Sequence, residues 1–306
     1  MEMTDLKRYL RERKEQVDSA LERYFPPLQP SGREMELLSS LHQAVRHSLF
    51  AGGKRIRPIL CMAACEVAGG RGEEVLPLAC GLEMIHTYSL IHDDLPAIDN
   101  DDYRRGKPTC HKVFGEATAI LAGDALLTEA FCIMTERVSY RNSEDGRLIL
   151  DAVNQVAKAA GISGMVGGQV VDIGAEGKDV DLPILQYIHT HKTGAMIRVS
   201  VQVGARFGGA KEEDLRALTR YGERIGLAFQ IADDILDVEG KLQTLGKTPG
   251  SDLSKRKATY PFVLGMEESK KRAGELVDLA VEALTPFGTE AEPLRGIAHF
   301  IVSRDA

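Results

Sequence analysis

Two dense clusters of aspartate lie far apart in this chain, and they constrain its fold more than any other feature. The first cluster contains Asp93, Asp94 and Asp99, and the second contains Asp233, Asp234 and Asp237. Carboxylates at this density repel one another unless a cation lies among them. The sequence therefore favours a fold in which each cluster lines a cation site. Their hard oxygen ligands suit magnesium, which usually keeps several waters and bridges to a phosphate.

Basic residues follow both clusters. They are Arg104, Arg105 and Lys107 after the first, and Lys247, Lys255, Arg256 and Lys257 after the second. When acidic clusters are flanked by cations, metal ions and basic side chains can share the neutralisation of one polyphosphate. We therefore expect a metal–polyphosphate site.

The second cluster fits one face of a helix. Asp233 and Asp237 are four residues apart, so they share a face, where like charges destabilise an isolated helix. A solvated acidic helix end would show the same spacing. The neighbours Phe229, Ile231 and Ile235 are apolar, however, which favours a helix that presents carboxylates to something polar.

The first cluster is less regular. Asp93 and Asp99 are six residues apart, and Pro96 interrupts helical hydrogen bonding between them. A bulge or kink could return both carboxylates to one site. A surface turn rich in Asp, Asn and Pro is the alternative.

Composition limits the class of protein. The chain has 306 residues, of which 43% are hydrophobic and 27% are charged, as in an ordinary globular protein. The net charge of -7 argues against a general nucleic-acid binder. Five cysteines without a CxxC pair argue against a disulfide or zinc framework and favour the reducing cytoplasm.

The chain shows no targeting or membrane-spanning signal. Residues 1–24 are charged and amphipathic, unlike a signal peptide. No uninterrupted apolar run reaches the roughly 20 residues of a membrane helix, so no stable membrane insertion is expected.

The hydrophobic pattern is helical nearly throughout. Good helix formers predominate, and no convincing run of alternating β-branched residues occurs. Expected breaks, rich in Gly, Pro or Asn, fall at residues 25–30, 51–53, 69–72, 141–143, 174–183, 208–209, 240–257 and 285–293. We predict an all-α, single-domain bundle over residues 1–306, with roughly ten helices. We expect the Gly-, Lys- and Ser-rich segment 240–257 to be mobile without ligand.

Several polar residues outside the clusters are candidate ligand contacts. Lys54 and Arg57 follow two glycines and can converge on one phosphate, although such a segment alone equally fits a surface turn. His86 lies two helical turns before Asp93, where a core histidine is the alternative. Lys192 and Thr193 lie in a helix-like segment, and Gln230 lies one turn before Asp234. Buried side chains of these types need partners, which a ligand could supply.

These elements together resemble the trans-prenyltransferases, the isoprenyl diphosphate synthases. The resemblance follows GGKRIRP, EMIHTYSLIHDDLPAIDNDDYRRGKPTCH, HKTG, FQIADDILD and LGKTPGSDLSKRKATYP in order along nearly the whole chain. The spacing within the first cluster is similar to that of bacterial farnesyl diphosphate synthases and plant-type geranylgeranyl synthases. The resemblance implies an all-α bundle around a deep central cavity, usually a homodimer, acting on isopentenyl and allylic diphosphates.

The resemblance also implies roles for individual residues. Asp93 and Asp99 would bind two magnesium ions and Asp233 a third, with Asp94 and Asp237 in supporting contacts and manganese as the alternative metal. The allylic diphosphate would be held by Arg104, Lys192, Lys247 and Lys257. The diphosphate of isopentenyl diphosphate would be held by Gly53, Lys54, Arg57, His86 and Arg105. Thr193, Gln230 and the Lys192 backbone would turn oxygens toward an allylic cation, with Gln169 and Asp172 behind them.

Product length would be set by the floor of the cavity. Ser89 is four residues before Asp93, and Tyr88 is five before it, about 7.5 Å along a helix. In the resemblance these positions form the floor, and an aromatic residue there fits a fifteen-carbon product. Core packing is the alternative role of Tyr88.

The leading prediction is therefore a magnesium-dependent farnesyl diphosphate synthase. Geranylgeranyl diphosphate synthase is the nearest alternative, and a longer polyprenyl synthase is a further one. A terpene cyclase would not need the second diphosphate site around Lys54. A catalytically silent partner subunit would be expected to lose aspartates, and none is lost here. A structural metal-binding helical protein is the remaining class.

Overall fold

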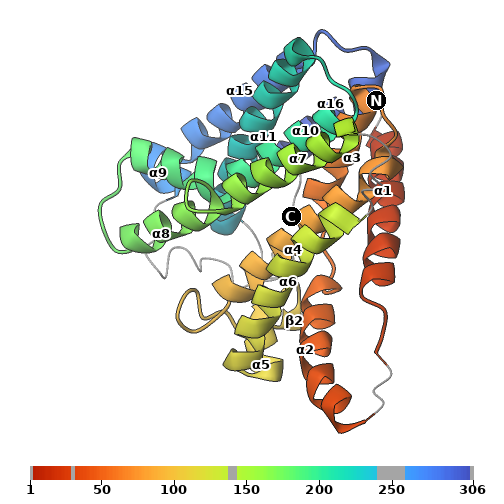
Figure 1. The fold of residues 1–306 in the computed structure, drawn as a ribbon. Coiled ribbons are helices and arrows are strands. Elements are labelled where there is room, and N and C mark those ends of the chain that lie inside the picture. Colours follow the sequence, from red (N-terminus) through yellow and green to blue (C-terminus); the bar gives the residue numbers. More distant parts are fainter. Residues whose placement is uncertain (1–2, 29–31, 137–142, 240–258, 304–306) are drawn as a thin grey trace.

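The computed structural model describes residues 3–28, 32–136, 143–239 and 259–303. In these ranges the chain is almost entirely helical, as Figure 1 shows. The prediction of an all-α fold is confirmed. Lys247, Lys257 and the segment 240–257, for which mobility was predicted, lie outside the described residues.

The first half of the chain contributes the helices that surround the first aspartate cluster. They are α1 (Met3–Tyr24), α2 (Arg33–Leu49), α3 (Ile56–Val67), the 3-10 turn η1 (Gly72–Val75), α4 (Leu76–Asp93), α5 (Cys110–Phe114) and α6 (Glu116–Glu136). Two-residue strands, β1 (Tyr103–Arg104) and β2 (Lys107–Pro108), form a small antiparallel hairpin between α4 and α5. This hairpin was not predicted, because two residues are too few to show an alternating pattern.

The second half carries the second cluster. Its elements are α7 (Ser143–Ala160), α8 (Met165–Ala175), α9 (Leu182–Ile188), the π-helix η2 (His189–Gly194), α10 (Ala195–Phe207), α11 (Glu212–Glu239), α14 (Tyr260–Leu264), α15 (Met266–Ala283), the 3-10 turn η3 (Thr289–Ala291) and α16 (Glu292–Ser303). The predicted breaks at 174–183, 208–209 and 285–293 separate helices as expected. The break between α7 and α8 was missed.

The interior consists of two hydrophobic clusters that share α3 and α10. One cluster packs α4 against α6 and also buries Cys61 of α3 and Met196 of α10. The other packs α11 against α15 and buries Leu60 of α3 and Ile197 of α10. A helix that is apolar on more than one face is expected in the middle of a bundle. The pair α3 and α10 therefore lies between the two hydrophobic clusters.

The two central helices approach closely and run parallel. A Cβ at Gly204 would lie 2.0 Å from the Cys61 backbone oxygen, and one at Gly208 would lie 2.3 Å from the Cys65 oxygen. Only glycine permits this approach. Because residue numbers increase together along both helices, their N-terminal ends lie at the same end of the bundle. The GGKR segment precedes α3 and the HKTG segment precedes α10, so the fold places both segments at that end.

Helix α6 is long and apolar enough to cross a membrane by length and composition alone. Asp124 and Glu129 interrupt its apolar sequence. One face, which includes Ala122, Leu126 and Ala130, is buried in the core against α4. Ile120 and Leu121 on the same helix are exposed, so only part of the apolar surface of α6 is covered by the core.

Candidate functional site

The first aspartate cluster lies where α4 ends. The chain turns back after Asp93, and the Asp99 N–H donates a hydrogen bond to the Asp93 carbonyl oxygen at 2.8 Å. The Asn100 N–H donates to the Leu95 oxygen at 3.0 Å, and Asn100 takes a left-handed conformation with φ 53°. The helix therefore stops instead of kinking at Pro96. The turn nevertheless brings the Asp99 backbone back beside Asp93.

Asp93 shows the electrostatic cost of this arrangement. Burial raises the pKa of Asp93 to about 6, and the neighbouring Asp99 and Asp94 carboxylates raise it too. Lys192 and Arg104 oppose the rise in this pKa. Lys192 is thus within electrostatic reach of Asp93, although it comes from the other half of the chain.

Asp94 binds Arg104 of the β hairpin. Its carboxylate is 3% exposed and accepts hydrogen bonds from Arg104 Nε at 2.8 and 2.9 Å. Burial raises the pKa of Asp94, and the Arg104 guanidinium lowers it. This geometry agrees with a supporting role for Asp94, which orients Arg104.

The second cluster lies on the last turns of α11. Gln230 Nε2 is 3.4 Å from Asp233 Oδ2, and the Thr193 hydroxyl donates to Gln230 Oε1 at 2.9 Å. Asp237 is buried, with 3% of its surface exposed. Hydrogen bonds between η2 and α11 therefore bring Thr193 and Gln230 together, and Gln230 lies beside Asp233, which was predicted separately as a metal ligand.

Asp234 has a partner that the sequence did not reveal. Its carboxylate accepts the backbone N–H of Tyr260 at 2.8 Å, and His189 Nε2 lies 3.6 Å away. Tyr260 is the first residue of α14, where helix N–H groups lack intrahelical partners. Asp234 therefore connects α11 to the start of α14.

Lys192 lies in the π-helix η2, between α9 and α10. Single π-helical turns widen a helix and occur frequently at functional sites. Lys192 Nζ forms an ion pair with Asp172 of α8 at 2.6 Å. A Cβ at Gly168 would lie 2.3 Å from the Lys192 backbone nitrogen, so α8 packs directly on this turn. Asp172 therefore binds Lys192 from α8, while the Gln169 Oε1 atom is buried without a hydrogen bond among the described residues.

The two clusters share one set of neighbours. The charge of Lys192 lowers the pKa of Asp93. The adjacent Thr193 donates a hydrogen bond to Gln230, which lies beside Asp233. Arg57 is also within electrostatic reach of Asp233. These links place both clusters and the segments GGKR and HKTG at the end of the bundle where α3 and α10 begin.

The residues predicted for the second diphosphate gather beside them. Burial lowers the pKa of His86 well below its usual value, and the positive charges of Arg57 and Arg105 lower it further. His86 is therefore neutral near pH 7. Lys54 lies 5.6 Å above the Phe300 ring, and the Arg57 Nε atom is buried without a hydrogen bond in the described part of the chain.

Arg105 supports the glycine pair of this segment. It donates a hydrogen bond to the Gly52 carbonyl oxygen. Its guanidinium lies so close to Gly53 that a Cβ there would be 2.6 Å from Arg105 Cζ. The close approach explains why glycine occupies position 53, where φ is 117°.

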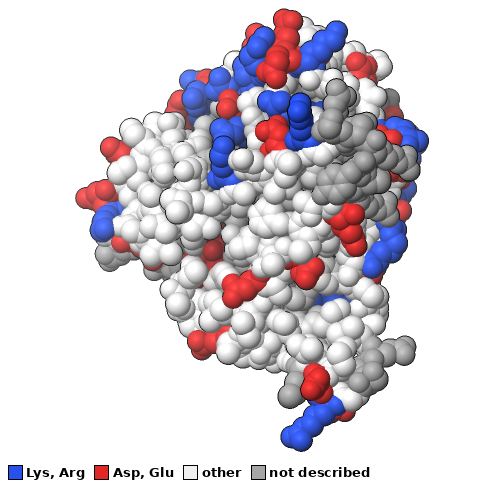
Figure 2. Space-filling model, viewed as in Figure 1, with Lys and Arg blue, Asp and Glu red and all other residues white. Residues whose placement is uncertain are grey.

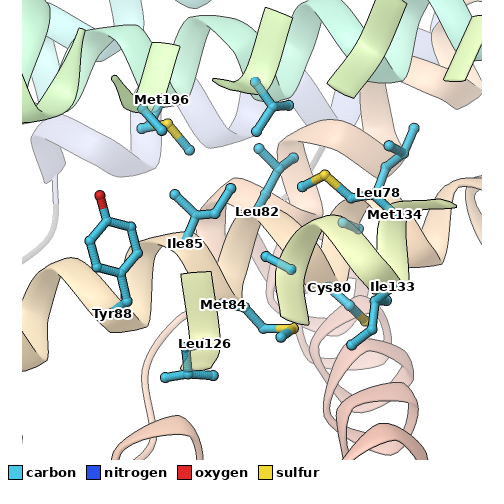
Figure 3. Packing of buried hydrophobic residues seen from close by; sticks show 14 of the residues in the cluster. Leu78, Cys80, Leu82, Met84, Ile85, Tyr88, Leu126, Ile133, Met134 and Met196 are labelled. Carbon is cyan, nitrogen blue, oxygen red and sulfur yellow. The ribbon is translucent and has the colours of Figure 1, made fainter. Parts of the chain in front are cut away.

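Tyr88 and Ser89 lie one turn before the first cluster. Tyr88 is 6% exposed, and its ring meets the His92 ring edge-on at 5.7 Å. Figure 3 shows Tyr88 projecting from α4 beside Ile85, with Met196 nearby. Burial raises the pKa of Tyr88 to about 12. Ser89 Oγ donates to the His86 oxygen at 2.9 Å, so its hydroxyl is used within the helix.

The residues present fit magnesium bound together with a phosphate ligand. Within the described ranges, no three His, Cys, Asp or Glu side chains are close enough to hold one metal ion. Magnesium sites of this kind use one or two carboxylates, waters and substrate phosphates, so a three-residue set is not required. The raised pKa of Asp93 also indicates a carboxyl group that a nearby cation would favour in its ionised form.

Comparison with known proteins agrees with this geometry. The polyprenyl synthetase family profile matches residues 39–285. A geranylgeranyl diphosphate synthase of Cyanophora paradoxa is 51% identical over 97% of this chain and 96% of its own length. A farnesyl diphosphate synthase of Geobacillus stearothermophilus is 46% identical over the whole of both chains.

Solved structures show the same fold. The crystal structure of an FPP/GFPP synthase from Zymomonas mobilis matches with a TM-score of 0.84 and 36% identity, covering 98% of this chain and 99% of that one. Substrates of the family are isoprenoid diphosphates, and its members are generally magnesium-dependent. The protein is a prenyltransferase, and its chain belongs to the polyprenyl synthetase family.

Proposed function

We propose that the protein condenses isopentenyl diphosphate with dimethylallyl and then geranyl diphosphate to give farnesyl diphosphate. The observation that carries the choice of product is the buried aromatic ring of Tyr88, one turn before Asp93 on α4. A growing chain that extends past Asp93 along α4 would meet this ring. The ring packs against His92, which limits how easily it can move aside.

The proposed reaction begins with loss of diphosphate from the allylic substrate. Bound magnesium would neutralise negative charge on the leaving diphosphate. Asp93, Asp99 and Asp233 would hold the metal ions. Lys192 and Arg104 would add positive charge to the same leaving group, as preorganised donors do where charge develops.

The remaining polar groups orient the two substrates. Arg57, Arg105 and Lys54 would bind the diphosphate of isopentenyl diphosphate, with neutral His86 as a hydrogen-bonding partner. Thr193 and Gln230 are fixed to each other by their hydrogen bond and would present oxygens to the allylic cation. The double bond of isopentenyl diphosphate attacks this cation, and a proton is then lost. The released diphosphate is the proposed proton acceptor.

The experiment is product sizing. The protein is incubated with magnesium, dimethylallyl diphosphate and isopentenyl diphosphate, and the prenyl chains are separated by chromatography. A fifteen-carbon product is expected. Tyr88→Ala should lengthen the product to twenty carbons or more, whereas Phe262→Ala, which removes an exposed aromatic ring on α14, should leave it unchanged. An unaltered product from Tyr88→Ala would refute Tyr88 as the floor.

Geranylgeranyl diphosphate synthase is the second candidate. The relative from Cyanophora paradoxa that carries this name is 51% identical over nearly the full chain. A twenty-carbon main product from the unaltered protein would favour this candidate and would show that chain growth passes Tyr88.

We also propose that the protein works as a homodimer in the cytoplasm. Figure 2 shows few charged side chains in the middle of the face formed by α6, α7 and α8. Helices α6 and α8 expose apolar side chains: Ile120, Leu121, Val166, Val170 and Ile173. An apolar patch of this kind on a folded protein commonly marks an interface. The family resemblance implies that a second copy of this chain covers it.

Light scattering after size-exclusion chromatography tests the dimer. The unaltered protein should have twice the mass of one chain, and Leu121→Glu with Val170→Glu should shift it toward the monomer. Leu279→Glu, at an exposed leucine of α15, is the matched control and should stay dimeric. A monomeric unaltered protein would reject this interface.

A further inference from the structure

Glu83 is a buried carboxylate to which the family comparison gives no role. It lies on α4, is 1% exposed and accepts a hydrogen bond from Arg55 Nη1 at 2.7 Å. Arg55 is itself only 3% exposed. Apolar residues of similar size often stabilise a core as well as a buried ion pair does. The position of this pair therefore suggests a task other than stability.

Arg55 connects the GGKR segment to three helices through side-chain hydrogen bonds. Its Nε donates to Asp18 of α1 at 2.9 Å, and its Nη2 donates to the Leu49 oxygen at the end of α2 at 2.7 Å. The bond to Glu83 adds α4. Arg55 also takes a left-handed backbone conformation with φ 53°, which is unfavourable for a residue other than glycine. Its three side-chain bonds hold the backbone in that conformation between Lys54 and Arg57.

The Glu83 charge also acts on the neighbouring arginines. Arg57 and Arg105 both lie within electrostatic reach of Glu83, and the two arginines repel each other. Burial lowers the pKa of Arg57, and Glu83 opposes this change. A buried cluster of like charges needs a counter-charge to keep its side chains together. Glu83 supplies this negative counter-charge from helix α4.

We propose that Glu83, through Arg55, is a positioning residue for the isopentenyl diphosphate site. It holds residues 53–57 and Arg105 in the arrangement that receives the diphosphate, without touching the ligand. The inference rests on the proposed function, because it takes Lys54, Arg57 and Arg105 as the cations of that site. Glu83 does not contact Lys192 or Asp233 in any bond that the structure shows among the described residues, so the allylic site should be unaffected.

Glu83→Gln in the full chain tests the proposal, since it keeps the size of the side chain and removes its charge. KM for isopentenyl diphosphate should rise about tenfold or more, while KM for the allylic diphosphate and kcat stay within about threefold. Glu66→Gln is the matched control, because Glu66 also binds an arginine, Arg13 at 2.6 Å, but lies away from the site. It should change thermal stability without altering either KM.

A second variant separates positioning from stability. Arg55→Met combined with Glu83→Leu replaces the ion pair by apolar side chains and should recover the thermal stability lost in Glu83→Gln. KM for isopentenyl diphosphate should remain raised about tenfold. If KM in either variant is within threefold of the unaltered value, or if both substrates are affected equally, the proposal is wrong. An unaltered protein that condenses no prenyl diphosphates would instead reject the proposed function.

Discussion

Replacement of Asp93 by asparagine should stabilise the metal-free protein. The pKa of Asp93 rises from its usual 3.8 to about 6, chiefly through burial. Each pKa unit corresponds to about 1.4 kcal/mol, so ionising Asp93 in the folded chain costs up to about 3 kcal/mol. Asparagine has a similar size and carries no charge, so Asp93→Asn removes this cost.

The effect has a defined pH dependence. Because the folded pKa lies above the unfolded one, Asp93 lowers stability as pH rises from about 4 to about 6, and the loss is constant above that range. The stability of Asp93→Asn relative to the unaltered protein should therefore increase by up to about 3 kcal/mol between pH 4 and pH 7. For a chain of this length, that corresponds to roughly 4–5 °C in Tm.

Urea unfolding between pH 4 and pH 8 in the presence of a metal chelator measures this difference. Asp278→Asn on α15 is the control, because Asp278 is exposed and its replacement should change stability by less than about 0.5 kcal/mol at any pH. Added magnesium and inorganic diphosphate should raise Tm of the unaltered protein more than that of Asp93→Asn. A stability difference that is the same at pH 4 and pH 8 would refute the reasoning.

Three further changes test the packing around the site. Gly204→Ala places a methyl against the Cys61 oxygen and should destabilise the protein by about 1–3 kcal/mol, measured as a lower Tm. An unchanged Tm would show that α3 and α10 can separate freely. Tyr221→Phe removes a buried hydrogen bond to the Leu294 oxygen of 2.7 Å and should cost about 1–2 kcal/mol in urea unfolding, and no loss would contradict its importance. Asp181→Ala removes the N-cap of α9 and should cost about 1 kcal/mol, with kcat retained if α9 still forms.

The sequence predicted those features that depend on local spacing. Helical periodicity gave the all-α fold, and glycine and proline marked most of the helix ends. The return of Asp99 to Asp93 was also expected, although the chain achieves it by ending α4. The β1–β2 hairpin was missed because strands of two residues show no recognisable period. The α7–α8 break was missed although Gly161 and Gly164 mark it in the sequence.

Pairings between distant residues could not be predicted from one sequence. Glu83 and Arg55 are 28 positions apart, and Asp172 and Lys192 are 20 apart. Each residue fits an ordinary polar position on a helix, and only the packing of helices shows its partner. Asp234 was likewise read as one more carboxylate of the second cluster, whereas its partner Tyr260 lies 26 positions further on.

The glycine contacts between α3 and α10 fix the distance between the two helices, and the proposed reaction takes place beyond the ends of these helices. Because the main chains touch at Gly204 and Gly208, no side-chain rotation can change the separation of the two helices there. The anion-binding segment before α3 and the lysine-bearing turn before α10 are therefore held at a fixed position relative to each other. In the proposed reaction, the two diphosphates would be kept in register by a backbone contact several turns away. Selection for a different substrate pair would have to alter the loops and leave this contact intact.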